Sequence, residues 1–152
     1  MQQQNLLVPV LGPLYRALKP VSEIGLRLAA GLFFVPHGAQ KLFGWFDGYG
    51  LEATGQYFEQ QLGFSNGYLA ALGAGSVEFF GGLFLAAGLL TRFSAAATAV
   101  LLTVAISLHL PSGFFWTQGG YEYPLLWLIL VLTFLVKGGG SYSLDRLIGR
   151  EI

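Results

Sequence analysis

Apolar residues are concentrated in four stretches, each close to the roughly 17–25 residues that a helix needs to cross a bilayer. The stretches are about 22–43, 68–90, 93–110 and 121–137. Only Thr91–Arg92 separates the second from the third, which predicts a tight antiparallel hairpin. The pattern predicts an all-α membrane protein, in which a bundle of four transmembrane helices forms a single membrane domain over residues 1–152.

Short amphipathic surface helices are predicted in the N-terminal arm, the first outer loop and the C-terminal tail. In the arm, leucines recur at helical spacing, and Pro9, Pro13 and Pro20 interrupt the segment. Pro20 followed by Ser22–Glu23 predicts the start of the first spanning helix. In the loop, the stretch LEATGQYFEQQL has one apolar face. In the tail, Ser143 is a predicted helix cap. The apolar positions of these helices are Leu7, Leu11, Leu14 and Leu18; Leu51, Thr54, Gly55, Phe58 and Leu62; and Leu144, Leu147 and Ile148.

Lysine and arginine are unevenly distributed between the loops, and this bias sets the orientation of membrane proteins. Loops 44–67 and 111–120 contain neither residue. The other side carries six cations, which are Arg16, Lys19, Arg92, Lys137, Arg146 and Arg150. We therefore expect a multi-pass protein with both termini in the cytoplasm and an aromatic belt on the outer side.

Composition supports the membrane assignment, since 54% of residues are hydrophobic and only 11% are charged, against about 25% charged in soluble domains. The net charge is zero, so the chain has no excess of positive charge of the kind that binds nucleic acid. There is no cysteine, which excludes thiol redox chemistry, iron–sulfur clusters and cysteine-ligated zinc on this chain alone. The N-terminus lacks the early basic region and small-residue cleavage site of a signal peptide.

The first apolar stretch contains ionisable residues that are costly inside a membrane, roughly 2.5–3.5 kcal/mol each for Arg or Lys at the centre of a helix. Arg27, Phe34 and Lys41 repeat every seven residues, and Gly31 and Gly38 share their stripe. One face of this helix is therefore expected to point toward protein, and the opposite face, with Leu26, Ala29 and Phe33, toward lipid.

Glu78 lies near the middle of the second stretch, with Ala74, Gly75, Gly81 and Gly82 three and four residues away. Small residues let another helix approach closely, so the polar stripes of the first two helices are expected to face each other. The helical rise of about 1.5 Å per residue gives the depth of each ionisable residue in the membrane. These depths predict a polar column. Its members from the outer mouth inward are Lys41, His109 and Glu122, then His37, Glu78 and Arg27.

Two interpretations of this column remain open. In one, Glu78 and Arg27 form a buried ion pair that fixes helix register. In the other, the column binds a polar headgroup and transfers protons, with Glu78 and His37 as the catalytic pair and Arg27, Lys41, His109 and Glu122 as binding residues. A quinone suits the second interpretation, because its carbonyls need donors and its reduction consumes protons. A metal site built from these residues has no closely spaced ligand pair, and we predict none.

Four motifs along the chain resemble the DoxX family of small four-helix membrane proteins. They are RLAAGLFFVPHGAQKLFG, VEFFGGLFLAAGLLTRFSA, HLPSGFFWTQGGYEYPLL and KGGGSYSLD. The family's helix-one arginine and G-x-x-K-L ending correspond to Arg27 and Gly38–Leu42, and its Glu with two glycines to Glu78–Gly82. Gly113–Phe115 and Gly119–Glu122 match its outer loop, although Ser112 stands where members often have Asn.

The resemblance implies a bacterial inner-membrane protein and a quinone-binding subunit of a membrane-associated oxidoreductase. With no cysteine, haem motif or dinucleotide fold in the sequence, an electron donor would be a partner subunit or the substrate itself. A homo-oligomer is the other expected assembly. The alternative function is a non-catalytic membrane scaffold or a small-molecule permease that uses the same polar column.

Overall fold

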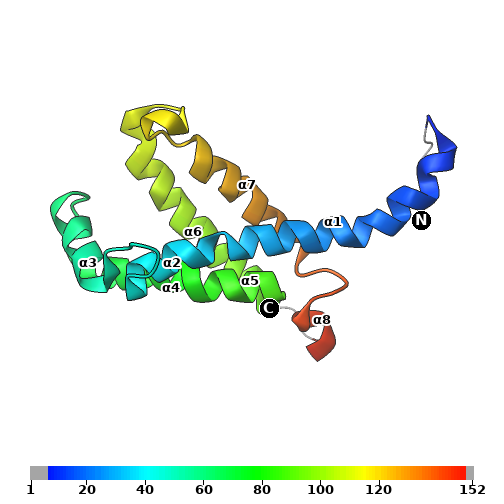
Figure 1. Ribbon diagram of the computed structural model, residues 1–152, viewed down its shortest axis with the longest axis horizontal. Helices are drawn as coiled ribbons and strands as arrows, with labels where there is room; N and C mark the ends of the chain where they lie inside the picture. Colours follow the sequence, from blue (N-terminus) through cyan, green and yellow to red (C-terminus); the bar gives the residue numbers. More distant parts are fainter. Residues whose placement is uncertain (1–6, 150–152) are drawn as a thin grey trace.

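The computed structural model describes residues 7–149, and the regular elements in that range are helical (Figure 1). The helices are α1 (Gly12–Leu32), α2 (Phe34–Phe43), α3 (Gly50–Gln60), α4 (Gly67–Ser76), α5 (Gly82–Ala87), α6 (Thr91–His109), α7 (Glu122–Lys137) and α8 (Leu144–Ile148). A π-helical segment, Val77–Gly81, joins α4 to α5 without a break, and short 3₁₀ turns cover Pro9–Leu11, Leu110–Ser112 and Trp116–Gln118.

Helices α1 and α2 form one long rod, interrupted only at Phe33 (Figure 1). The sequence explains the interruption: Pro36 has no N–H to donate to the carbonyl of Leu32, four residues earlier, and its ring crowds that carbonyl. The predicted helix over 22–43 is therefore present but locally broken.

The predicted start of the first helix is wrong, because α1 begins at Gly12 and continues through Pro20. Proline at an interior position removes one backbone donor and costs about 3 kcal/mol, but it does not forbid helical geometry. Pro13 lies in the first turn, where proline is tolerated, and the Ser22 hydroxyl donates to the carbonyl of Lys19 over 2.8 Å. The predicted arm helix is thus the exposed beginning of α1, not a separate element.

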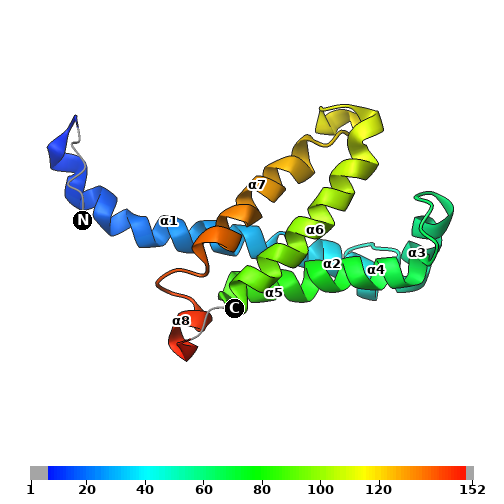
Figure 2. The same cartoon turned by 180° about the vertical axis from the view of Figure 1, so that it is seen from behind.

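The α1–α2 rod packs along α4 and α5 at very short range (Figures 1 and 2). A Cβ atom on Gly31 would overlap the carbonyl oxygen of Gly82, and one on Gly38 would overlap the backbone nitrogen of Phe79. The expected facing of the two small-residue stripes is confirmed at these positions. Gly81, in contrast, faces α6, where its nearest neighbours include the Thr98 hydroxyl.

Helices α6 and α7 form an antiparallel hairpin (Figure 2). The hairpin runs diagonally to two rods, namely α1–α2 and the continuous helix formed by α4, the π-helical segment and α5. The core lies where this hairpin crosses the rods, and the indole of Trp127 stacks edge-on against Phe33 and Phe34. The buried members of the core are Ala30, Phe34, Leu85, Ala95, Leu102, Val131 and Phe134. Beyond the crossing, the tip of the hairpin diverges from α3 and α4 (Figure 1).

Within residues 7–149, two segments are long and apolar enough to cross a membrane: Gly67–Ala87, with a mean hydropathy of 1.6, and Thr91–Ser112, with 1.9. The predicted stretches 68–90 and 93–110 correspond to them within three residues, and the connecting turn lies at Gly88–Leu90 instead of Thr91–Arg92. Helix α7 matches the predicted stretch 121–137 but has only 16 residues.

The predicted helices of the first loop and the tail are present as α3 and α8. Thr54 and Gly55 are buried on the face of α3 predicted to be apolar. Ser143 accepts a hydrogen bond from the amide of Arg146, as expected of a helix cap. Arg150, which contributes to the predicted charge bias, lies outside the described residues.

Candidate functional site

A cavity of about 800 Å³ lies between α3 and α4 on one side and α6 on the other. Its wall is mainly apolar, and its ionisable members are Lys41, Tyr57, Glu78 and His109. The apolar side chains include Phe58, Leu62 and Phe64 from the α3 region and Val100, Leu101, Val104 and Leu108 from α6. This volume is within the range of typical ligand sites, roughly 300–1,000 Å³.

The Lys41 ammonium group pairs with the Glu78 carboxylate within this wall. Its Nζ lies 2.7 Å from Oε2 and 3.0 Å from Oε1, and 3.4 Å from the carbonyl oxygen of His37. The side chains are 23% and 12% exposed. An ion pair in an apolar wall has lost most of its hydration, so each charge depends on the other.

Glu78 lies in the π-helical segment Val77–Gly81. A single π turn inside an α-helix inserts extra backbone and redirects side chains, and such turns are frequent at functional sites. Here the turn lies where Gly75 and Phe79 contact the rod at Gly38 and where Glu78 meets Lys41. The sequence contains the glycines that permit this contact but no signal that predicts the π turn.

Only part of the predicted polar column is brought together. Lys41, Glu78 and His109 line the cavity, whereas Arg27, His37 and Glu122 do not. His37 is exposed. Lys41 was expected beside His109 and Glu122 at the outer boundary, but its long side chain turns back toward Glu78, which is the stronger electrostatic partner.

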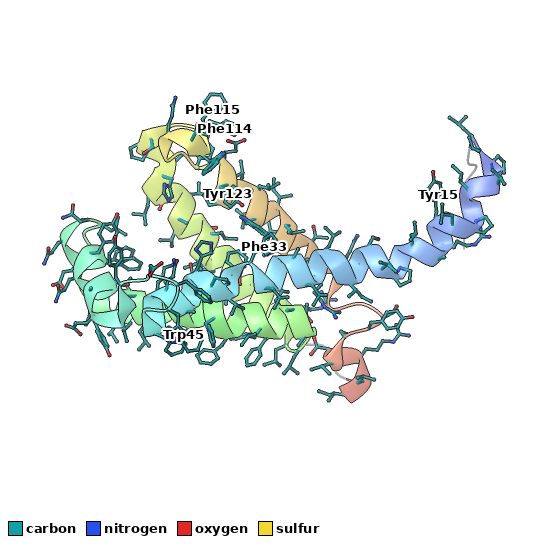
Figure 3. The ribbon with its side chains drawn as sticks, viewed as in Figure 1. Tyr15, Phe33, Trp45, Phe114, Phe115 and Tyr123 are labelled. Atoms are coloured by element: carbon teal, nitrogen blue, oxygen red, sulfur yellow. The ribbon has the colours of Figure 1, made fainter. Side chains whose placement is uncertain are left out.

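His109 and Glu122 hold the loop between α6 and α7. The His109 Nδ1 lies 2.7 Å from the carbonyl oxygen of Gly119, and the Glu122 Oε2 accepts a hydrogen bond from the amide of Trp116 over 3.2 Å. The two residues flank this loop, and only His109 also contributes to the cavity. Figure 3 shows Phe114 and Phe115 at the tip of this loop, far from Trp45 at the end of α2.

Arg27 is buried, and the predicted pairing of its guanidinium group with Glu78 is wrong. Its Nε donates to the carbonyl of Ala86 over 3.2 Å, Nη1 donates to Gly139 and Nη2 to Tyr142 over 2.7 Å. A planar guanidinium group presents several donors in a fixed fork, and three carbonyls at the end of α5 and in the tail satisfy them. The prediction failed because sequence distance gave no indication that the tail folds back to this helix.

Asp145 is a buried residue of this region that was not among the predicted site residues. Its carboxylate accepts hydrogen bonds from the amides of Leu90 and Thr91 and from the Thr91 hydroxyl, over 2.7–2.9 Å. It therefore caps the start of α6 from the tail. The only signal in the sequence was its place two residues after the predicted cap Ser143, in the fourth family-like motif.

Metal binding has no support from the arrangement of side chains. Within residues 7–149, no three His, Asp or Glu side chains gather closely enough to hold a metal ion.

Comparison with known proteins places the chain in a family. The DoxX family model matches residues 24–111, which include the first two motifs and the start of the third. A stretch of 62 residues is 42% identical to an uncharacterized protein from Haemophilus influenzae and covers 40% of this chain. The match spans about 41% of that protein's length. No solved structure matches the chain.

The family match is consistent with the structure, because the matched region contains the apolar segment Gly67–Ala87 and all but the last residue of Thr91–Ser112. It also contains Lys41, Glu78 and His109, the ionisable residues shared by the predicted column and the cavity. The resemblance noted from the motifs is thereby confirmed: the chain belongs to the DoxX family of membrane proteins.

Proposed function

We propose that the chain binds a quinone-type molecule in the cavity between α3, α4 and α6, as a subunit of an oxidoreductase in the bacterial inner membrane. The observation that carries this proposal is the Lys41–Glu78 ion pair in an otherwise mainly apolar wall. An apolar pocket with a few polar groups is the usual form of a site for a lipid-soluble molecule.

Several features of the site support this chemistry. Ionisable residues within membrane helices are expensive and generally functional. Glu78 can accept or release a proton at the cavity, and Lys41 can neutralise the charge that remains. Redox chemistry of a quinone moves protons as well as electrons. The electrons would be exchanged with a partner protein or with the substrate itself, since the sequence contains no cysteine, haem motif or dinucleotide fold.

Binding tests the proposal directly. Purified protein in detergent is titrated with a short-tailed benzoquinone and the matching benzoquinol by calorimetry. Glu78→Gln removes the charge, and Gly73→Leu extends a side chain into the cavity from a position where a Cβ has no atom within 4 Å. Both variants should weaken binding of the tighter ligand by about tenfold or more. Glu59→Gln, on an exposed position of α3, is the matched control.

No binding by the wild-type protein, or equal binding by wild type, Glu78→Gln and Gly73→Leu, would contradict the proposal. Thermal unfolding of each variant distinguishes loss of the site from loss of the fold.

We also propose that the α1–α2 rod and α7 cross the membrane together with the two apolar segments, giving four spans with both termini in the cytoplasm. Six Lys and Arg residues lie on the proposed cytoplasmic side and none lie in the outer loops 44–67 and 111–120, which supports this orientation. Because the chain has no cysteine, single cysteines can be introduced at exposed Tyr49 and Lys137. An impermeant thiol reagent applied to intact cells should label Tyr49→Cys but not Lys137→Cys; the reverse pattern would contradict this topology.

A permease or scaffold is the alternative. A binding site is supported over a translocation path because the cavity lining does not reach Arg27, whose guanidinium group is bound to the carbonyls of Gly139 and Tyr142. A transport assay measures uptake of the same benzoquinol into liposomes with and without the protein. Faster uptake by the protein-containing liposomes, together with loss of that increase in Gly73→Leu, would support the permease instead.

A further inference from the structure

We infer that the resting site selects the hydroxyl-bearing, reduced form of its ligand, a quinol, over the carbonyl-bearing quinone. The inference rests on the proposed function and names the substrate form. It concerns binding alone and involves no electron transfer.

The first observation is that the Lys41 donors are already engaged. An ammonium group has three N–H bonds and no acceptor. Three acceptors lie within hydrogen-bond distance of Nζ: both Glu78 carboxylate oxygens, at 2.7 and 3.0 Å, and the carbonyl oxygen of His37, at 3.4 Å. A ligand carbonyl would therefore have to displace one of these partners to receive a hydrogen bond from Lys41.

The second observation is that the Glu78 carboxylate keeps spare acceptor capacity. An ionised carboxylate offers about four lone-pair positions, and Lys41 occupies two of them. Within residues 7–149, Lys41 is the one side chain that donates to this carboxylate. A ligand hydroxyl can thus bind Glu78 without disturbing the ion pair.

The third observation concerns His109, which lines the same cavity. Its Nδ1 lies 2.7 Å from the Gly119 carbonyl oxygen, which can only accept. Nδ1 therefore carries a hydrogen, and in the neutral tautomer with that hydrogen Nε2 is an acceptor. The hydroxyl residues of the lining, Tyr57 and Ser112, can donate or accept and favour neither form. The spare acceptor capacity of Glu78 thus matches a ligand that donates.

A quinone carbonyl placed against Glu78 would face an acceptor, and its oxygen would lose its hydrogen bonds with water there without replacement. A site built to hydrogen-bond a hydroxyl rejects an analogue that lacks it for this reason. The shared chemistry is an O–H donor on an apolar body, which an aliphatic alcohol also provides.

The test compares four ligands with the same tail on the wild-type protein, under anaerobic conditions: benzoquinol, benzoquinone, the quinol's dimethyl ether and the aliphatic alcohol. The quinol should bind about tenfold or more tightly than the quinone and the ether, the value expected for one hydrogen bond to a charged group. The aliphatic alcohol should bind more weakly than the quinol. In Glu78→Gln the preference for quinol over quinone should largely disappear, because an amide both donates and accepts.

Quinone or ether binding as tight as that of the quinol overturns this inference while leaving the proposed function intact. Alcohol binding as tight as that of the quinol overturns the quinol assignment in favour of a simple hydroxyl. Failure of all four ligands to bind overturns both the inference and the proposed function. If Glu78→Gln does not fold, the four-ligand comparison on the wild-type protein decides alone.

Discussion

Asp145 and Thr91 are 54 residues apart in the sequence, yet two hydrogen bonds join them, one from the Thr91 amide and one from its hydroxyl to Oδ2. The other carboxylate oxygen accepts from the amide of Leu90, and the Asp145 amide donates to the carbonyl of Gly88 over 2.8 Å. The tail is thereby attached to the turn between the two apolar segments, and α6 receives its N-terminal cap from outside its own sequence.

Removal of this cap should destabilise the fold. Asp145→Ala leaves two buried amides and a hydroxyl without their acceptor, so we expect the free energy of unfolding to fall by ~2 kcal/mol or more. Asp145→Asn keeps one side-chain acceptor and should cost less. Thermal unfolding in detergent measures both, with Glu59→Gln as the control. Equal stability of Asp145→Ala and wild type would show that the cap is energetically unimportant.

Arg27 should hold the tail against the rod. Arg27→Met removes all three hydrogen bonds to Ala86, Gly139 and Tyr142, and Arg27→Lys retains the charge without the planar fork. Amide hydrogen exchange in residues 139–148 should accelerate in Arg27→Met and, to a smaller extent, in Arg27→Lys. Arg16→Lys, on an exposed part of α1, should leave the exchange unchanged. Equal protection in Arg27→Met and wild type would exclude a clamp at this position.

Two glycines of the same helix should respond in opposite directions to alanine. Gly31→Ala forces a methyl group into the backbone of Gly82 and Ala86, which no rotamer change relieves, and should cost about 1–3 kcal/mol of stability. Gly25→Ala has no atom within 4 Å of the new Cβ and should gain up to ~1 kcal/mol from helix propensity. The free energies of unfolding of the two variants, measured in parallel, test the contact. A Gly31→Ala variant as stable as Gly25→Ala would mean that α1 does not contact α5 at this position.

The Lys41–Glu78 pair should show strong coupling. Lys41→Met leaves a buried carboxylate without its counter-charge, and Glu78→Gln leaves the ammonium; each should cost about 3 kcal/mol. The double variant, which restores a neutral pair, should lose less than the sum of the two single losses. A double-mutant cycle of unfolding free energies measures the difference, and additive losses would indicate that the two charges do not interact.

Much of the fold was predictable because local chemistry decides it. The apolar stretches are confirmed as helices since a chain in lipid must satisfy its backbone internally. Three glycines after Lys137 terminate α7, and Ser143 starts α8 as its cap. The spacing of Gly31 and Gly38 predicted the face that contacts α4 and α5.

The site was only partly predictable, because partners depend on how elements meet in space. The sequence by itself determined that charged side chains on the first helix need partners, since an unpaired charge in an apolar environment is expensive. Only the tertiary structure decided which partners they have. The π turn and the flexible Lys41 side chain bring Glu78 to Lys41, while the returning tail offers Arg27 the carbonyls that its rigid fork requires.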